Sequence, residues 1–441
     1  MPVSLLLWAL AGTMGASLLA LIPALHVYNV AAIVLLLIEG GRLPLAPEAM
    51  TYLFLGMVAG YAMTNTIPSI LLSVPDESMV FVVLPGQAYV QRQRGYEAVV
   101  LTGVGGLAGL TTLALLAPVA SRWLPALREI LQPHLGWILW TVIAYLLLSE
   151  WPKGAGRGTT GWRRLREGWA SLFAGLATFL LSGLLGLILM YRSPVPVTVA
   201  YQGLLPAFVG LFAVPWIVVN LLGRVSLPSQ VIPKAIDAPW HVVLHGTLAG
   251  VLGGLFAAFF PVVTGGIGGL LGGHATAQRD DRAFIISQGA AKLVTYVGGF
   301  LLFFVPGLHL TRGGMAWMVS TQYTAVTPSD YLLATGAALL SGGLAFLLSL
   351  PLARLVMAAI ARLGIRRISW LTLAILLAVV GGMTGLVGLG ICAVATGIGL
   401  IPVLWGSRRM NTMGVLLLPI ALSMSGAGAW VAGLLGLLQG A

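Results

Sequence analysis

The chain has 441 residues, of which 59% are hydrophobic and only 8% are charged, and its formal net charge is +11. Soluble proteins carry about 25% charged residues, so no soluble fold could bury this much apolar surface. Uncharged stretches such as 1–38, 199–223, 368–407 and 410–441 exceed the roughly 20 apolar residues that one membrane-spanning helix needs. These runs are continuous and lack the alternation of a transmembrane β-barrel. We therefore predict an all-α polytopic membrane protein with roughly 10–14 membrane segments.

The excess of positive charge could indicate nucleic-acid binding. However, the basic residues lie in short loops between apolar runs, where the positive-inside rule places them. We therefore expect a multi-pass protein of the cell (cytoplasmic) membrane, in contact with membrane lipid and not with nucleic acid. Cys392 is the one cysteine, which excludes an internal disulfide and a cysteine-based metal cluster.

An internal repeat divides the chain into two copies. The pattern Ala11-Gly12-x-x-Gly15 recurs as Ala249-Gly250-x-x-Gly253, 238 residues later, and Thr102-Gly103 recurs as Thr335-Gly336, 233 residues later. Single matches mean little in a glycine-rich chain, but a shared order of blocks at nearly constant offset indicates duplication. We predict a first transmembrane repeat at 1–222, a linker at 223–239 and a second repeat at 240–441.

Loop charges predict that the two copies are inverted. Loop 151–169 has five basic residues, whereas 121–135 has two arginines. In the second half the bias is reversed, with four arginines in 354–367 and no basic residue in 321–330. By the positive-inside rule, corresponding loops then lie on opposite sides, as in many secondary transporters. The alternative is a parallel repeat whose loop charges differ by chance.

Matching interruptions predict where a ligand binds. The stretches Leu21–Asn29 and Phe259–Gly266 each place a proline, Pro23 or Pro261, between two apolar runs. Paired breaks of this kind form half-helices whose free backbone groups face a cavity near the bilayer midplane. Such half-helix N-termini favour anions. The alternative is a pair of proline-kinked helices without a ligand.

Further polar groups lie at membrane depth. Second interruptions occur at Thr64–Pro68, Ser73–Ser78 and Val305–His309. Asp76 and Glu77 lie between apolar runs, which indicates either a functional pair or a tight turn at the membrane surface. Lys292 is the only charge in residues 283–305, too deep for easy snorkelling. We expect it to be a substrate counter-ion, or the partner of Asp76 or Glu77 in a buried ion pair that fixes helix register.

These observations define the candidate site. Gln288, Thr295 and Tyr296 lie at i−4, i+3 and i+4 from Lys292 and therefore share its helical face. The candidate coupling or ion-pair residues are Asp76 and Glu77. The candidate substrate-binding residues are His26, Tyr28, Asn29, Thr64, Asn65, Thr264, Gly265, Gly266, Gln288, Lys292, Thr295 and Tyr296.

The chain offers no motif for an enzyme. The glycine-rich stretch 265–273 resembles a phosphate loop, but no strand precedes it and no Gly-Lys-Ser/Thr follows. Close helix packing explains it better. No nucleophile–base pattern or metal-ligand spacing stands out, so we expect no catalysis, no cofactor and no metal.

Several motifs resemble a known family. Leu21–Asn29, Ile70–Ser78 with Leu84-Pro-Gly-Gln87, Leu180–Leu187, Leu204–Phe212 and Ser287–Ala291 are similar to the large permease subunit of tripartite tricarboxylate transporters (TctA-like), in particular to its shorter, stand-alone relatives. The resemblance implies a secondary carrier with inverted repeats. It also implies citrate-like substrates, which a periplasmic binding protein delivers in the tripartite members. The chain differs from the glycine-rich breaks of that family at Pro23-Ala24 and Pro261-Val262.

The sequence leaves three functions open. The first is a secondary transporter for a small, carboxylate-like organic anion, working by alternating access and coupled to H⁺ or Na⁺. The alternative is a polyprenyl-phosphate (lipid-phosphate) translocase, which also has two proline-interrupted segments in inverted halves. The third is an enzyme or structural membrane protein without transport. The expected partners are membrane lipid, a small anionic substrate or a lipid phosphate, and H⁺ or Na⁺, and a homodimer is left open.

Overall fold

The protein is an all-α polytopic membrane protein, as predicted. The computed structural model describes residues 2–23, 25–150, 161–195, 203–223, 227–323 and 327–438, and every regular element in these ranges is a helix. Seven of these helices are long and apolar enough to cross a membrane, or eight if a pair bent by 115° near the C-terminus counts as one span. The basic loop predicted at 151–169 is described only from residue 161 onward.

Two of the seven helical stretches are much longer than one crossing requires. They contain 54 residues (Gly95–Leu148) and 77 residues (Pro328–Leu404), compared with the roughly 20 residues of one crossing. The longer stretch, α16, has a positive φ at Gly364 (+74°) and at Gly385 (+65°), which interrupts the helical conformation. Each of these two stretches is therefore long enough for more than one crossing of the membrane.

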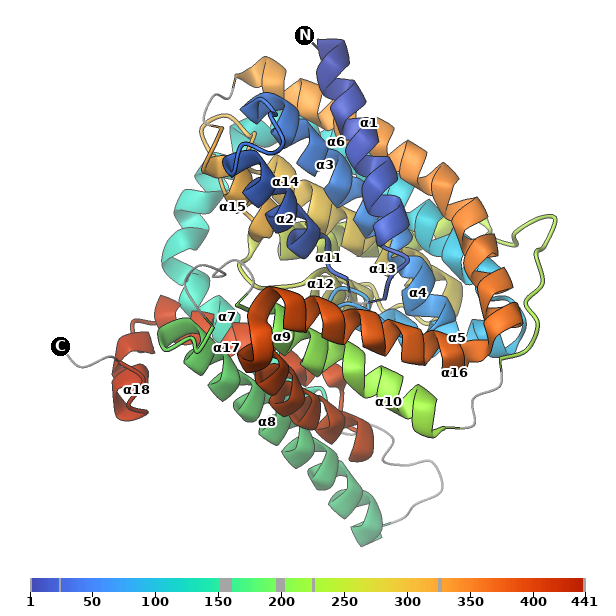
Figure 1. The fold of residues 1–441 in the computed structure, drawn as a ribbon, viewed down its shortest axis with the longest axis vertical. Helices are drawn as coiled ribbons and strands as arrows, with labels where there is room; N and C mark the ends of the chain where they lie inside the picture. The colour runs from blue at the N-terminus through green and yellow to red at the C-terminus, as the bar shows by residue number, and fades with distance from the viewer. Residues whose placement is uncertain are drawn as a thin grey trace. The chain divides into compact units, whose positions relative to one another are not determined.

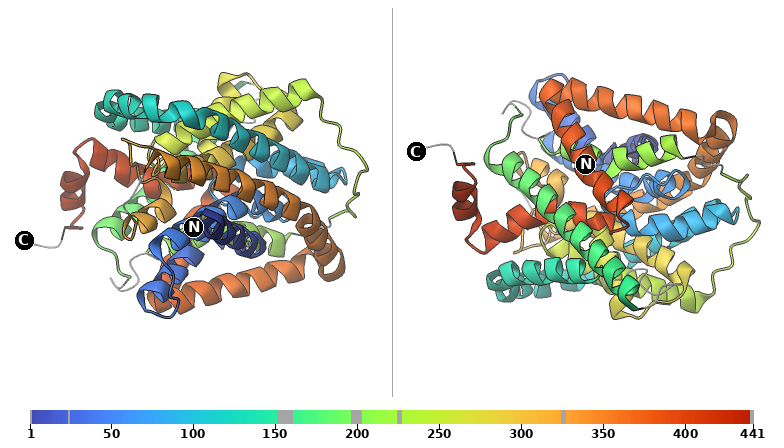
Figure 2. Two further views of the ribbon diagram at one scale, coloured as in Figure 1. Left: turned by 90° about the horizontal axis from the view of Figure 1, so that it is seen from above. Right: turned by 90° about the horizontal axis from the view of Figure 1, so that it is seen from below.

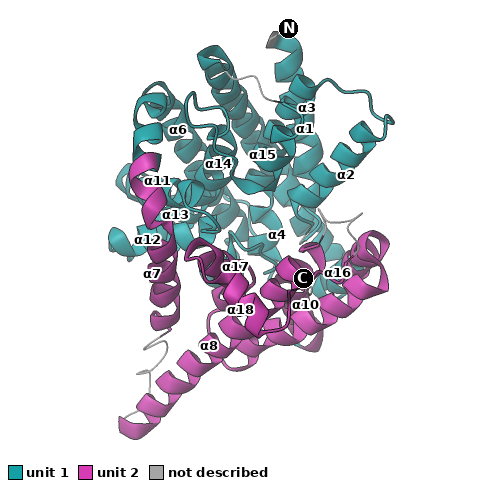
Figure 3. Ribbon diagram, turned by 90° about the vertical axis from the view of Figure 1, so that its left-hand side faces the viewer, with its two compact units in different colours: residues 1–128, 223–372 teal, residues 129–222, 373–441 magenta. Residues whose placement is uncertain are grey.

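The chain forms two compact units (Figure 3). Unit 1 comprises residues 1–128 and 223–372, and unit 2 comprises residues 129–222 and 373–441. Each unit therefore contains one stretch from each predicted repeat. The repeats and their inversion stay predictions, because compactness does not test sequence duplication.

The helices of unit 1 contain the site described below. In chain order they are α1 (Pro2–Leu19), α2 (Val27–Glu39), α3 (Pro47–Thr64), α4 (Thr66–Leu71), the 3₁₀ helix η1 (Val80–Val82), α5 (Val83–Gln91), α6 (Gly95–Leu131, with its last residues in unit 2), α11 (Trp240–Phe259), α12 (Gly265–Ala275), α13 (Asp281–Leu293), the π-helix η5 (Val294–Gly298), α14 (Gly299–Leu301), α15 (Gly313–Ser320) and the first part of α16 (Pro328–Leu404).

Unit 2 contains the remaining helices. They are the 3₁₀ helix η2 (Gln132–His134), α7 (Leu135–Leu148), α8 (Gly161–Tyr191), α9 (Leu205–Phe208), the π-helix η4 (Val209–Ala213), α10 (Val214–Leu222), the end of α16, the 3₁₀ helix η6 (Arg409–Met413), α17 (Gly414–Met424) and α18 (Gly428–Leu434).

Glycines allow the helices of unit 1 to pack closely. α1 lies beside α3, and α11 lies beside α13 and α12 (Figure 1 and Figure 2). A Cβ atom on Gly12 of α1 would overlap the carbonyl oxygen of Leu53 on α3, and one on Gly250 of α11 would overlap that of Ser287 on α13. A Cβ atom on Gly268 of the glycine-rich α12 would likewise overlap the carbonyl oxygen of Gly253 on α11. The glycine-rich stretch thus serves helix packing, as predicted.

Both proline-containing interruptions separate distinct helices rather than kink one helix. α1 ends at Leu19 and α2 begins at Val27, while α11 ends at Phe259 and α12 begins at Gly265. Proline supplies no backbone N–H, so each break lacks one hydrogen bond of the helical ladder. The carbonyl oxygen of Phe259, the last residue of α11, has no partner within the helix and accepts a hydrogen bond from Arg312 Nη2 at 2.5 Å. Val262 in the second break has a φ of +53°, a strained conformation for a β-branched residue.

The described part of the linker belongs to unit 1 and packs against the turn between α5 and α6. The backbone N–H of Gly95 donates to Gln230 Oε1 at 2.8 Å, and Gln230 Nε2 donates to the carbonyl oxygen of Val90 at 3.0 Å. Both bonds fasten the linker to the turn between α5 and α6. Residues 224–226 of the predicted linker lie outside the described ranges.

Candidate functional site

A buried lysine stands at the centre of the site. Lys292 is in the last turn of α13, and its side chain has no exposed surface. α13 begins at a side-chain cap, because Asp280 accepts hydrogen bonds from the backbone N–H groups of Arg282 and Ala283. Directly after Lys292 the helix widens into the π-helix η5. Such wide turns occur frequently at functional sites.

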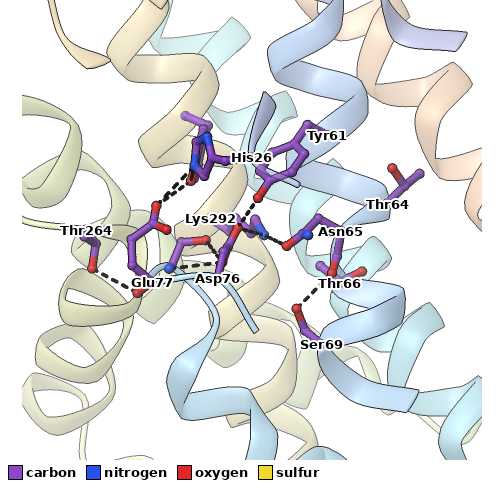
Figure 4. Close-up of polar contacts among 12 residues, drawn as sticks. His26, Tyr61, Thr64, Asn65, Thr66, Ser69, Asp76, Glu77, Thr264 and Lys292 are labelled. Carbon is purple, nitrogen blue, oxygen red and sulfur yellow. Dashed lines mark hydrogen bonds and ion pairs between the residues drawn. The ribbon is translucent and has the colours of Figure 1, made fainter. Parts of the chain in front are cut away.

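Lys292 pairs with a carboxylate from the other predicted repeat. Its Nζ donates to Asp76 Oδ2 at 2.8 Å and to Asn65 Oδ1 at 2.7 Å (Figure 4). Asn65 joins the broken helix pair α3 and α4, and Asp76 follows α4 in the interruption predicted at Ser73–Ser78. Ser73 opens this loop with a φ of +58°. The break in the helix thus brings the carboxylate to the lysine.

The Asp76 carboxylate is fully occupied by donors. Oδ2 accepts from Lys292 and from the Tyr61 hydroxyl at 2.9 Å, while Oδ1 accepts from the Ser78 hydroxyl at 2.6 Å and from the Ser78 backbone N–H at 3.1 Å. Hydrogen bonds to an ionised group are the strong ones in a low-dielectric interior. Four donors therefore favour the ionised carboxylate, and the pair with Lys292 is neutral as a whole.

Glu77 makes a second, less buried group with a histidine and a tyrosine. Glu77 Oε1 accepts from the Tyr296 hydroxyl at 2.8 Å and lies 3.4 Å from His26 Nε2. The His26 Nε2 and the Tyr296 hydroxyl are 2.9 Å apart. The side chains of His26 and Glu77 are 19% and 13% exposed, in contrast to 4% for Asp76.

The tautomer of His26 follows from its place at the start of α2. Its Nδ1 accepts the backbone N–H of Tyr28 at 3.2 Å, as an N-cap. A ring nitrogen that accepts a hydrogen bond has no proton, so in this geometry the proton lies on Nε2 and the ring is neutral. Nε2–H can then donate toward Glu77 or Tyr296.

The two predicted breaks meet at Glu77. His26 follows the first break and faces the Glu77 carboxylate, while Thr264 follows the second break and donates its hydroxyl to the Glu77 carbonyl oxygen at 3.3 Å (Figure 4). Thr264 also caps α12, because its Oγ1 accepts the backbone N–H of Ile267. A helix N-terminus therefore lies beside the acidic loop.

Aromatic rings surround the charged groups. The His26 ring centroid lies 4.4 Å from that of Tyr28 and 5.0 Å from that of Tyr61. Lys292 Nζ lies 5.2 Å from the Tyr61 ring centroid and 5.9 Å from that of Tyr296. Cation–π attraction of this kind helps to hold a desolvated ammonium group.

Two buried amide side chains, Asn65 and Gln288, have polar atoms without a hydrogen-bond partner. Asn65 Nδ2 has none, and neither the nitrogen nor the oxygen of the Gln288 side chain has one, although both side chains are completely buried. A Cβ atom on Gly269 of α12 would lie 2.6 Å from Gln288 Nε2, so this amide faces α12. Unsatisfied buried polar groups are costly and need a functional or structural explanation.

Comparison with known proteins identifies the family. The profile of the tripartite tricarboxylate transporter TctA family matches residues 6–414. The chain belongs to this family. An uncharacterized protein of Methanocaldococcus jannaschii is 24% identical to this TctA-family chain over 423 residues, which are 95% of this chain and 98% of that protein. No solved structure matches the chain. The predicted family resemblance is confirmed, and the TctA family is a family of transporters.

Several predicted site residues of this TctA-family chain lie near the cluster without joining it. The Thr64 hydroxyl donates within its own helix, to the Gly60 carbonyl oxygen at 2.7 Å, and the Thr295 hydroxyl does the same toward Ala291. In the described parts of the chain, the Asn29 side chain makes no hydrogen bond to the cluster, although its backbone N–H donates to the His26 carbonyl oxygen. Gly265 and Gly266 form the buried first turn of α12, where a Cβ on Gly265 would lie 3.2 Å from Lys292 Cα.

The sequence reasoning missed two donors of the cluster and one buried acid elsewhere. Tyr61 and Ser78 donate hydrogen bonds to Asp76, and Tyr61 stands 235 residues before Tyr296, close to the repeat offset that could have revealed it.

In unit 2, Glu150 is completely buried and accepts from the backbone N–H of Arg408 at 2.7 Å and from Asn411 Nδ2 at 3.0 Å. Glu150 stands at the end of an apolar run, next to the basic loop predicted at 151–169.

The acidic loop is a poor metal site in this arrangement. Donor atoms of His26, Asp76 and Glu77 lie within 4.8 Å of one another. However, the Lys292 ammonium already contacts Asp76 at 2.8 Å and would repel a metal cation at that carboxylate. We assign no metal ligand in the cluster.

Proposed function

We propose that this TctA-family chain is a secondary transporter of the cytoplasmic membrane for a small organic anion of the carboxylate class. It works by alternating access between two inverted repeats and is coupled to H⁺ or Na⁺. The family match supports transport, and it favours the carboxylate hypothesis over the lipid-phosphate hypothesis. The substrate site is the cluster around Lys292.

The observation that carries the proposal is the combination of a buried ammonium and unpartnered amide donors. Lys292 is completely buried and donates to Asn65, whose Nδ2 is unsatisfied. Gln288, one turn earlier on α13, has an unsatisfied Nε2 that faces α12. Intramembrane charges are costly and are typical of substrate pathways. A carboxylate offers acceptor oxygens for both amides and a negative charge for the lysine. The N-terminus of α12 adds a favourable dipole for an anion.

Uptake by the purified protein tests this function. The chain is reconstituted into liposomes and offered radiolabelled citrate, succinate and lactate, and in parallel a fluorescent polyprenyl phosphate. The proposal predicts saturable uptake or counterflow of at least one carboxylate and no movement of the lipid. Movement of the lipid phosphate without uptake of any carboxylate would replace the proposal by the alternative.

A further inference from the structure

The cluster holds one negative charge too many for an anion site. Asp76 and Glu77 provide two carboxylates, and Lys292 provides one ammonium. His26 does not make up the difference, because its Nδ1 accepts the N–H of Tyr28 and the ring is neutral in this geometry. If both carboxylates are ionised, an anionic substrate would add a further negative charge to a poorly solvated site. Like charges repel strongly there. On the proposed function, the anion must therefore bind together with a cation.

The hydrogen bonds indicate which carboxylate receives that cation. Asp76 accepts four hydrogen bonds, one of them from an ammonium, and these would be weakened by protonation. Glu77 accepts one side-chain donor at Oε1, from Tyr296, and its Oε2 accepts no hydrogen bond from any described residue. Glu77 is also the more exposed of the two. Protonation therefore costs less at Glu77 than at Asp76.

The surroundings of Glu77 contain few other groups that titrate near neutral pH. The ionisable groups that face it are Tyr28 on α2, Tyr61 on α3, Tyr296 on η5, Lys292 on α13, Asp76 in the same loop and His26 at the start of α2. Tyrosine titrates at about pH 10 in water, far above neutrality, and the Lys292 ammonium is paired with Asp76 at 2.8 Å. His26 Nε2 lies 3.4 Å from Glu77 Oε1 and 2.9 Å from the Tyr296 hydroxyl, so its N–H can donate to the Glu77 carboxylate while that group is ionised.

We propose that Glu77 and His26 form the proton site that couples transport to a pH gradient. A proton from the open side binds to the Glu77 carboxylate when the anion binds, and it leaves to water when the anion is released on the other side. The Asp76–Lys292 pair keeps its charges throughout the cycle. No covalent bond to the substrate forms, and one proton crosses the membrane with each anion.

The accumulation ratio in proteoliposomes tests this inference with citrate as the probe. The membrane potential is clamped to zero, and Na⁺ is absent. At zero potential an inward gradient of one pH unit supports about tenfold accumulation for each cotransported proton. With one proton for each anion, we expect accumulation by the wild-type chain to approach this ratio. We expect Glu77→Gln to reduce the ratio to about one while citrate–citrate exchange remains measurable, because the amide cannot bind and release a proton.

A matched control is available on α2. Glu39 lies at the exposed end of this helix, and Glu39→Gln makes the same chemical change away from the cluster. It should keep the wild-type accumulation ratio. A Glu77→Gln protein with the same ratio as Glu39→Gln would overturn the inference. So would wild-type accumulation that follows a Na⁺ gradient and ignores the pH gradient.

A second variant covers the case in which Glu77→Gln does not fold. Asparagine is a strong N-cap, so His26→Asn preserves the start of α2 and removes the ring near Glu77. The pH at which uptake is half-maximal should shift in this variant, and an unchanged pH profile would contradict the inference.

If the wild-type chain neither takes up nor exchanges any carboxylate, the proposed function itself fails. That result differs from uptake without proton coupling, which would contradict only the inference about Glu77 and His26.

Discussion

Lys292 Nζ and Asp76 Oδ2 are 2.8 Å apart although 216 residues separate them in the chain. The lysine belongs to the second predicted repeat and the aspartate to the first. Both side chains are buried, so the pair joins α13 to the loop after α4 in an environment where neither charge is well solvated.

Removal of the Asp76 charge should destabilise the protein. Asp76→Asn leaves the Lys292 ammonium buried without its carboxylate, and breaking a buried pair from one side costs about 3–5 kcal/mol. The melting temperature of the protein in detergent should therefore fall well below that of the wild type. Adding Lys292→Met should restore much of the loss, because the orphaned charge is then gone. A double variant that melts no higher than Asp76→Asn would contradict the pairing.

Close packing of α1 on α3 depends on Gly12. A Cβ at this position would overlap the carbonyl oxygen of Leu53, so Gly12→Ala should destabilise the protein by about 1–3 kcal/mol. Gly15, one turn along the same helix, provides a matched control, because a Cβ added there would have no neighbouring atom within 4 Å. Gly15→Ala should melt within a few degrees of the wild type. Equal effects of the two substitutions would show that α1 does not pack on α3 in this register.

The cap of α13 should give the protein an acid-sensitive contribution to stability. Burial opposes ionisation of Asp280, but hydrogen bonds from Arg282 and from the backbone N–H groups of Ala283 and Arg282 outweigh it and hold the pKa below its ordinary value of 3.8. Because the folded-state pKa is lowered, this contribution is present above the ordinary value and is lost as the pH falls through the lowered pKa.

Two substitutions at Asp280 separate the cap from the charge. Asp280→Ala removes the cap and should cost about 1 kcal/mol at neutral pH. Asp280→Asn retains a capping oxygen but cannot titrate, so it should cost less. Its melting temperature should also fall less steeply than that of the wild type below about pH 4. The check is the melting temperature of all three proteins as a function of pH. A wild-type protein and an Asp280→Asn protein with parallel profiles would show that the carboxylate makes no pH-dependent contribution.

The positions of the two helix breaks could be predicted from Pro23 and Pro261 because the two prolines stand at matching places in the repeat. A proline alone is not sufficient, since α6 continues through Pro118 and Pro125. The depth of Lys292 was likewise visible in an uncharged run. Its partner was not: Asp76 and Glu77 are neighbours with the same charge, and only the turn after α4 decides which one meets the lysine. Tyr61 was missed because an aromatic residue in an apolar run resembles ordinary core.

The organisation into units also exceeded what the sequence could predict. Repeated motifs indicate duplication at 1–222 and 240–441, whereas compactness depends on contacts between distant segments and divides each half in two. The π-helix that follows Lys292 had no local signal either, since no glycine or proline stands between Lys292 and Val297.

The inverted topology can be tested by cysteine labelling. Cys392 is the one cysteine, so a Cys392→Ala protein provides the background for single cysteines at exposed positions. Glu167→Cys in α8 and Leu363→Cys in α16 test the two basic segments that the sequence predicted as loops, while Ile130→Cys and Ser329→Cys test their counterparts. The positive-inside rule predicts that a membrane-impermeant maleimide added to cells labels the second pair and spares the first. Labelling of positions 167 and 363 from outside, with 329 protected, would reverse the assignment.

The most direct test of the whole account is equilibrium binding of the transported carboxylate to the Lys292→Met protein, with its melting temperature measured in the same preparation. Methionine keeps the length of the side chain and removes the charge. We expect the variant to melt at a lower temperature than the wild type, because it leaves the Asp76 carboxylate without its ammonium partner, but to remain folded and monodisperse at the assay temperature. It should bind the carboxylate at least about tenfold more weakly, a loss of about 1.4 kcal/mol. Wild-type affinity in a folded Lys292→Met protein would show that the anion binds elsewhere.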